Sequence, residues 1–137
     1  MSRLLLDTCA AIWTVEGEPM SDSAMKAISS AIDDGIPILI APITAWERGL
    51  LAAKGRIVSP MTPHRWFEVL LSQPGLQLAE MSVDTLIDSS FLPGQPQGDP
   101  ADRIIIATAR SFDLTIVTRD RSILDYAALG HVRALAC

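Results

Sequence analysis

The chain has 137 residues, of which 49% are hydrophobic, and its 11 basic and 16 acidic residues give a formal net charge of −5. This length predicts a single domain over residues 1–137, and two cysteines are too few for a disulfide framework. The acidic balance excludes binding of nucleic acid through bulk positive charge, and no apolar run is long enough for a membrane span. We therefore expect a cytoplasmic protein without a membrane anchor.

The first half of the chain alternates short apolar runs with amphipathic segments. Residues 3–7, RLLLD, form an apolar run that ends in an acid, which is typical of a buried strand. Residues 21–35 have apolar side chains at helical spacing between a serine and a glycine, and residues 36–42 form a second buried run. Helices are predicted again over residues 43–55 and 62–75, each closed by a glycine.

The second half continues the same alternation. A shorter helix is predicted over residues 83–94, and its end overlaps an irregular connector with three prolines and two glycines at 92–100. Residues 98–111 place two aspartates and a proline at the head of an apolar helix. Residues 114–120 predict a strand that is followed by an acid, and residues 119–130 predict the last helix.

Residues 132–136 are predicted to form an edge strand. Strands that are separated by helices along the chain indicate the α/β class, with a parallel sheet and helices on both of its faces. Ligands of such sheets bind outside the carboxyl ends of the strands. Side chains at that edge are therefore the first candidates for a functional site.

Five acids are expected at this edge of the sheet. Asp7 ends the first strand, Asp120 follows a later strand, and Glu47 lies near the start of the helix that follows the second apolar run. Asp99 and Asp102 open a helix that leads into the same sheet. Helix capping explains one acid at each helix start, but it does not explain why all five converge on one crevice.

Carboxylates that lie together without counter-ions raise one another's pKa, which costs stability. No lysine lies near these acids in the sequence. A hard cation relieves the repulsion, and several carboxylates with open water positions suit Mg²⁺, or alternatively Mn²⁺. Such a metal makes its bound water more acidic and neutralises charge on a phosphodiester. The acids therefore predict nuclease chemistry.

Four stretches of the sequence carry a resemblance: LLLDT, APITAWERGL, GDPADRIIIATA and LTIVTRD. They resemble the four motifs of the PIN-domain ribonucleases, and most of all the VapC-type toxins of bacterial toxin–antitoxin pairs. The resemblance implies a three-layer α/β/α sandwich with a central parallel sheet and a Mg²⁺-dependent endoribonuclease that cleaves RNA. It also implies a homodimer and a cognate antitoxin whose C-terminal segment fills the groove, with DNA contacted only through that antitoxin.

The family's functional residues can be transferred by motif. The resemblance implies four catalytic acids that also bind metal, namely Asp7, Glu47, Asp102 and Asp120. Asp99 matches an additional metal-binding acid of one branch of the family. Residues expected to contact RNA or to orient the acids are Thr8, Thr118, Arg103, Arg119 and Arg121.

This sequence departs from that branch in two places. Cys9 stands where the branch commonly has histidine, and Gln97-Gly98 stands where it commonly has His-Arg. Neither change affects an expected metal ligand. Cys9 also excludes a phosphatase of the haloacid-dehalogenase type, which needs a second aspartate at that position. The alternative that stays open is a catalytically silent PIN-like domain that binds RNA or a protein partner.

A surface for protein partners is also predicted. The mean hydropathy is positive, at +0.30, which indicates more apolar surface than an isolated monomer needs. An apolar helix face formed by Ile43, Trp46, Leu50 and Leu51 is the expected contact surface.

Overall fold

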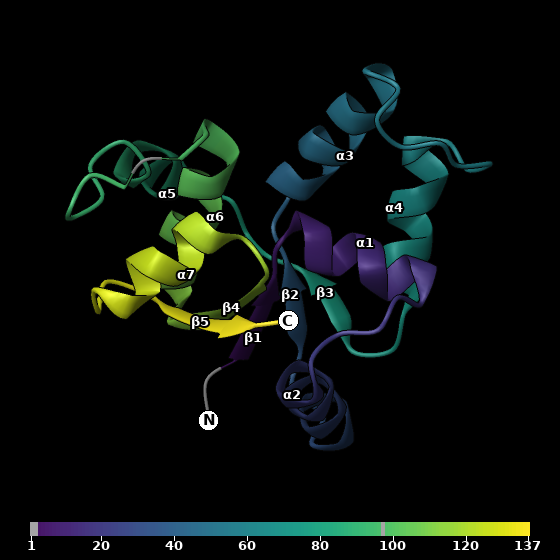
Figure 1. Cartoon of the computed structure of the whole chain (residues 1–137), viewed down its shortest axis with the longest axis horizontal. Helices are drawn as coiled ribbons and strands as arrows, with labels where there is room; N and C mark the ends of the chain where they lie inside the picture. The colour runs from purple at the N-terminus through teal and green to yellow at the C-terminus, as the bar shows by residue number, and fades with distance from the viewer. Residues whose placement is uncertain (1–2, 97) are drawn as a thin grey trace.

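The computed structural model describes residues 3–96 and 98–137, and a five-stranded parallel sheet forms its centre. The strands are β1 (Arg3–Leu6), β2 (Ile38–Ile40), β3 (Leu76–Leu78), β4 (Leu114–Thr118) and β5 (Arg133–Ala136). Their order in the sheet is β3-β2-β1-β4-β5, so the N-terminal strand lies in the middle (Figure 1). In the register, Leu5 of β1 lies opposite Leu39 on one side and Ile116 on the other.

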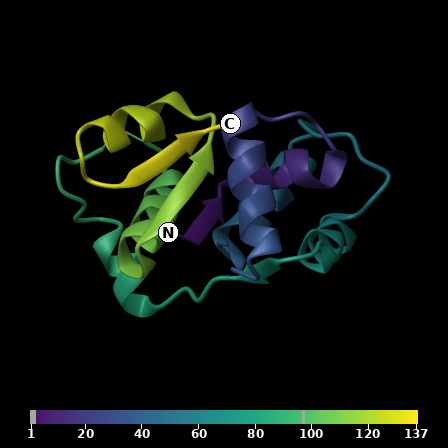
Figure 2. The ribbon, with the colours of Figure 1, turned by 90° about the horizontal axis from the view of Figure 1, so that it is seen from below.

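Helices cover both faces of this sheet, which makes the three-layer α/β/α fold expected from the sequence. The described helices are α1 (Thr8–Glu16), α2 (Asp22–Asp33), α3 (Ile43–Ala53), α4 (Pro63–Ser72), α5 (Val83–Asp88), α6 (Pro100–Phe112) and α7 (Arg121–Ala128). Both views place α6 and α7 on one side of the sheet and α1 and α2 on the other (Figure 1 and Figure 2). Within the described residues, no helix has the length and apolar character needed to cross a membrane.

The central strand contributes to two separate cores because successive side chains of a strand point to opposite faces. Leu5 packs with the core under α6 and α7, whereas Leu4 and Leu6 pack with the core under α1, α2 and α4. All three leucines are buried, with at most 6% of each exposed. This explains why the strand is a continuous apolar run rather than an alternating one.

Two elements of the structure were not predicted from the sequence. Helix α1 begins directly after β1 and ends at Gly17, whose φ of 72° is left-handed. Its apolar residues do not keep to one stripe, because consecutive residues such as Ala10, Ala11 and Ile12 are all buried between the sheet and α4. Strand β3 has only three residues and is largely exposed at the edge of the sheet. The predicted edge strand over residues 132–136 is confirmed as β5.

A candidate metal centre at the carboxyl edge of the sheet

Asp7 links the middle strand to the first helix. It follows β1 and caps α1, where its Oδ1 accepts a hydrogen bond of 2.8 Å from the N–H of Ala10. Its Oδ2 accepts a second hydrogen bond from the hydroxyl of Thr118 at the end of β4. Burial raises the pKa of Asp7, and these two hydrogen bonds only partly oppose that effect. The carboxylate is therefore held rigidly where two neighbouring strands end.

Glu47 reaches the same place from helix α3. Figure 1 shows the N-terminal ends of α1 and α3 close together beyond the sheet. The hydroxyl of Thr8, the first residue of α1, donates a hydrogen bond of 2.5 Å to Oε1 of Glu47. Burial raises the pKa of Glu47, the charges of Asp99, Asp7 and others add to the shift, and the hydrogen bond from Thr8 lowers it.

Asp99 and Asp102 stand at the start of α6. Asp99 caps the helix by accepting a hydrogen bond of 2.8 Å from the N–H of Asp102, and Pro100 occupies the first turn. Burial, followed by the charges of Asp99 and the other acids, raises the pKa of Asp102 to about 7. Asp102 is thus partly protonated near neutral pH as long as no cation is bound.

Three of the acids form a compact group, which we call the carboxylate cluster: Glu47, Asp99 and Asp102. Each offers one oxygen, and these oxygens lie within 4.8 Å of one another. Asp7 and Asp120 lie outside this group, yet the charges of both raise the pKa of Asp102 and of Glu47. Asp99 has two roles in the structure, because it caps α6 and is also a member of the cluster.

Asp120 lies between β4 and α7, near enough for its charge to raise the pKa of Glu47 and of Asp102. It caps α7, and its Oδ1 accepts hydrogen bonds from the N–H of Ile123 at 3.1 Å and from the hydroxyl of Ser122 at 2.6 Å. Its own N–H donates to the hydroxyl oxygen of Thr118 at 2.9 Å. Thr118 therefore ties Asp7 and Asp120 together.

No positive side chain neutralises these acids within the described part of the chain. The ion pairs found there, Arg65–Glu68 and Arg133–Asp113, involve none of them. The donors of the cluster are carboxylate oxygens, which are hard ligands of the kind that Mg²⁺ and Mn²⁺ prefer. The donor set therefore fits a divalent metal ion, and such an ion would remove the repulsion that raises the pKa of Asp102.

Comparison with known proteins shows the family to which this chain belongs. A family model described as the PIN domain matches residues 4–129. The chain belongs to the PIN domain family. It is 30% identical over 122 residues to ribonuclease VapC22 of Mycobacterium tuberculosis, a match that covers 88% of this chain and 89% of that protein.

Solved structures also share the PIN fold of this chain. VapBC2 from Rickettsia felis, bound to a DNA fragment from its promoter, matches with a TM-score of 0.70 at 15% identity, over 97% of each chain. DNA-bound VapBC from Salmonella typhimurium matches with a TM-score of 0.67 at 22% identity, over 99% of this chain and 98% of that one. A toxin–antitoxin complex from Klebsiella pneumoniae has a TM-score of 0.60 at 22% identity, over 96% and 95%.

The arginines predicted to contact RNA have different surroundings in this PIN domain. Arg103 donates a hydrogen bond of 2.8 Å to the carbonyl of Gly98. The guanidinium of Arg119 stacks on the ring of Trp13 at 3.8 Å and donates to the carbonyl of Cys137 at 2.9 Å. Arg121 is exposed at the start of α7. Arg119 is therefore partly occupied by contacts within the PIN domain.

Sequence reasoning missed one polar residue of the site, Thr44, and did not predict the protonation state of the Cys9 thiol. Thr44 is fully buried, and its hydroxyl oxygen lies 3.2 Å from that of Thr8. No sequence signal singles it out, because Thr8 lies 36 residues away and is brought near by packing of α1 against α3.

Burial and the surrounding carboxylates raise the pKa of Cys9 to about 11, so this thiol stays protonated at neutral pH. Gln97, part of the second departure from the family, lies outside the described residues.

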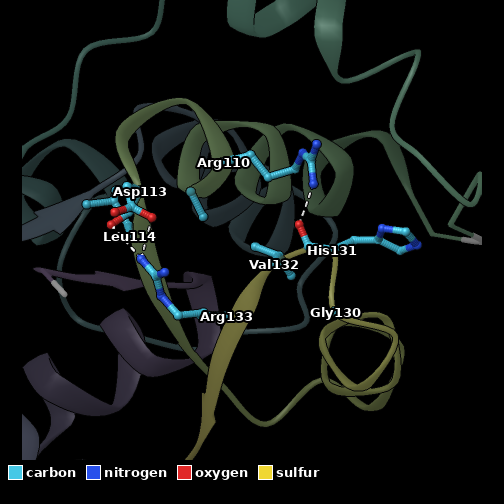
Figure 3. Close-up of a pocket in the computed structure, with 8 residues that line it drawn as sticks. Arg110, Asp113, Leu114, Gly130, His131, Val132 and Arg133 are labelled. Carbon is cyan, nitrogen blue, oxygen red and sulfur yellow. Dashed lines mark hydrogen bonds and ion pairs between the residues drawn. The ribbon is translucent and has the colours of Figure 1, made fainter.

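A cavity of about 270 Å³ lies at the opposite edge of the PIN domain, where α6 ends and β4 and β5 begin (Figure 3). Its charged groups are already engaged: Arg110 donates to the carbonyl of His131, and Arg133 pairs with Asp113 at 2.5 Å. This cavity is therefore separate from the acids and does not extend the metal centre.

Proposed function

We propose that this PIN domain is a Mg²⁺-dependent endoribonuclease and the toxin of a toxin–antitoxin pair. The observation that carries the proposal is the carboxylate cluster at the carboxyl edge of a parallel sheet, whose acids take part in none of the ion pairs found within the described residues. The similarity to ribonuclease VapC22 supports RNA as the substrate. The cytoplasm is the proposed place of action, since both RNA and the free thiols Cys9 and Cys137 suit it.

The residues of the site have distinct roles in this proposal. Glu47, Asp99 and Asp102 would hold Mg²⁺, or Mn²⁺ in its place, and Asp7 and Asp120 would complete its surroundings. When bound, the metal supplies a more acidic water and neutralises charge on the scissile phosphodiester. The acids must be ionised to bind it, so the raised pKa of Asp102 makes metal binding compete with protons near pH 7.

The hydroxyls and arginines around the acids position the metal ligands and the RNA. Thr118 and Thr8 donate to Asp7 and Glu47, so these carboxylates keep fixed orientations. Arg103, Arg119 and Arg121 are the proposed phosphate contacts at the rim. Arg121 is the strongest of the three, because it is exposed and directly follows Asp120.

An RNA cleavage assay tests the proposed activity. We expect the purified chain to cut RNA with Mg²⁺ present and to stop when EDTA is added, and Mn²⁺ should restore cutting. Asp102→Asn, purified in the same way, should lose at least about 100-fold in rate, because a ligand of the metal is removed. Asp34→Asn, which changes the exposed C-cap residue of α2 outside the site, is the matched control.

The open alternative has a different signature in the same assay. A silent PIN-like domain would bind RNA or a partner, yet wild type and Asp102→Asn would show equal and negligible cutting with Mg²⁺. Equal cutting by wild type and Asp102→Asn would instead indicate a contaminating nuclease. Either result would contradict the proposed catalytic role.

An antitoxin is the second proposed partner. A cavity of about 460 Å³ lies between α3 and α4 and is lined largely by apolar side chains: Ala45, Gly49, Pro63, His64, Phe67, Glu68 and Leu71. Trp46, which also lies on α3, is 53% exposed. The structural neighbours include VapBC complexes, two of them with DNA bound. We propose that DNA is contacted through the antitoxin and not by this chain.

The apolar face predicted on α3 is narrower in the structure. Ile43 packs against the core under α6 and α7, and Leu51 packs against the core on the other side of the sheet. Of the four predicted residues, only Trp46 and the half-buried Leu50 are left for a partner.

The antitoxin segment is proposed to place an arginine or lysine among the acids, where it would replace the metal. A cognate antitoxin, for which the product of a gene next to the one that encodes this chain is the first candidate to test, should therefore form a complex with the chain and inhibit its cutting.

The chain itself is proposed to form a homodimer through α5. This short helix and the turn after it expose four large apolar side chains, Val83, Leu86, Ile87 and Phe91, of which Phe91 is 80% exposed. Such a patch is unusual on a monomer and is typical of an interface.

A further inference from the structure

Thr44 is a buried polar residue in the first turn of α3, and its hydroxyl lies next to that of Thr8. It lies one helical turn before Glu47 and is completely buried. Its Oγ1 is 3.2 Å from Oγ1 of Thr8, and Oγ1 of Thr8 is 2.5 Å from Oε1 of Glu47. Three side chains from the starts of two helices are thus connected in a row that ends on a member of the carboxylate cluster.

The direction of the hydrogen bonds in this row follows from the donor and acceptor capacity of each group. An ionised carboxylate only accepts hydrogen bonds, and a threonine hydroxyl has a single proton to donate. Thr8 donates that proton to Glu47, so its oxygen accepts from Thr44. The row therefore runs from Thr44 through Thr8 to Glu47, and Thr44 fixes which way the hydroxyl of Thr8 points.

The hydroxyl of Thr44 is available for this contact because it lacks the usual local acceptor. Thr14 and Thr108, which also lie on helices, donate to the carbonyls four residues back at 2.9 Å and 2.7 Å. The carbonyl four residues before Thr44 belongs to Ile40 in strand β2, where it accepts from the N–H of Ala79 at 2.8 Å. Within the described residues, Thr8 is the partner left for the Thr44 hydroxyl.

We propose that Thr44 is a positioning residue for Glu47 that acts through Thr8, an assignment that rests on the proposed function. The row holds the Glu47 carboxylate toward Asp99 and Asp102 before any metal arrives. Without Thr44, the hydroxyl of Thr8 turns more freely and Glu47 samples other orientations. Metal binding then has to order this carboxylate, so affinity for the metal falls while the fold is kept.

Binding of Mn²⁺ to the full chain, stripped of metal and followed by electron paramagnetic resonance of free Mn²⁺, tests the assignment without an activity readout. Thr44→Val keeps the shape of the side chain and removes the hydroxyl, and Thr44→Ala removes the hydroxyl without adding a methyl group. We expect both to raise the Kd for Mn²⁺ about three- to tenfold, the size expected for one lost hydrogen bond. Thr44→Ser should keep the wild-type Kd.

A matched control and a double variant separate positioning from a general packing effect. Thr108→Val removes an equally buried helical hydroxyl that bonds only to backbone, and its Kd should equal that of wild type. If Thr44 acts through Thr8, adding Thr44→Val to Thr8→Val should leave the Kd of Thr8→Val unchanged. If the two substitutions instead have additive effects on the Kd, Thr44 does not act through Thr8 and the assignment is wrong.

The remaining outcomes distinguish this assignment from the proposed function. If wild type binds Mn²⁺ but Thr44→Val and Thr44→Ala bind it equally well, the role of Thr44 is wrong and the metal centre stands. If wild type binds no Mn²⁺, the proposed function and the role of Thr44 fail together. Weaker binding by Thr108→Val to the same extent would show that the effect comes from packing, and would also overturn the assignment.

Discussion

At the scale of single residues, three acids of the candidate metal centre hold protons more tightly than ordinary carboxyl groups. Burial is the first cause for Asp7, Glu47 and Asp102, and repulsion among the acids is added to it. For Asp102 the pKa rises from 3.8 to about 7. A group that binds its proton better in the folded chain than in the unfolded chain stabilises the fold at low pH.

The pH dependence of metal-free stability follows from that shift. The contribution of Asp102 is fully present below the unfolded pKa near 3.8 and is lost as the pH rises through about 7. We therefore expect the Tm in EDTA to fall between pH 5 and pH 8, and to fall less in Asp102→Asn, which has no proton to lose. Thermal melting at four pH values measures both slopes. Equal slopes for Asp102→Asn and the control Asp34→Asn would contradict the shift.

At the scale of secondary structure, three helices begin at the metal centre with an aspartate as the cap. Asp7, Asp99 and Asp120 cap α1, α6 and α7, and each accepts a hydrogen bond from a backbone N–H of the first turn. Helix N-termini favour negative charge, so the helices help to keep acids at this edge. The same side chains therefore serve folding and lie at the candidate site, so their capping role does not exclude the proposed metal-binding role.

Two substitutions of Asp99 separate these roles. Asparagine caps a helix about as well as aspartate but lacks the charge, whereas alanine loses both. We expect Asp99→Asn to weaken Mn²⁺ binding with little change in the free energy of unfolding. Asp99→Ala should weaken binding and also cost about 1 kcal/mol of stability. Urea unfolding and Mn²⁺ titration of both variants provide the comparison, and wild-type affinity in Asp99→Asn would remove Asp99 from the carboxylate cluster.

Arg119 joins three elements near Asp120. Its stacking on Trp13 of α1 and its hydrogen bond to Cys137 after β5 anchor the turn between β4 and α7. Arg119→Ala should therefore lower the free energy of unfolding by about 1 kcal/mol. Arg121→Ala, which removes an exposed guanidinium two residues away, should leave stability unchanged and raise the KM for RNA. If urea unfolding shows no difference between the two variants, the contacts of Arg119 do not stabilise the fold.

At the scale of the whole molecule, charge and apolar surface lie on different parts of the chain. The acids occupy the carboxyl edge of the sheet, while α5, which packs against α6, exposes a patch of large apolar side chains. A stable two-fold interface buries on the order of 1,600 Å² in total. The α5 patch offers the apolar centre for such an interface.

The proposed dimer has a direct test by light scattering at micromolar concentration. Wild type should have twice the chain mass of 14.8 kDa, and Ile87→Asp should shift the population to monomer because it places a charge in the centre of the patch. Val58→Asp is the control, since Val58 is 99% exposed in the segment between α3 and α4. A monomeric wild type, or a dimer unaffected by Ile87→Asp, would contradict the α5 interface.

The sequence by itself determined the fold class and the set of candidate acids, because both depend on local signals. Short apolar runs marked the strands, and acids at the strand ends and helix starts pointed to one edge. Local signals were insufficient for α1 and β3. Helix α1 is buried on too many sides to show an amphipathic stripe, and β3 is three residues long with little apolar pattern.

Only the tertiary structure decided which side chains meet. It grouped Asp99 with Glu47 and Asp102, directed Ile43 and Leu51 of α3 into two different cores, and brought Thr44 to Thr8. Position along a strand determines the edge at which a residue lies, because the strands are parallel and all their carboxyl ends lie at one edge of the sheet. The partner of its side chain depends on how elements far apart in the chain pack, and no local pattern contains that information.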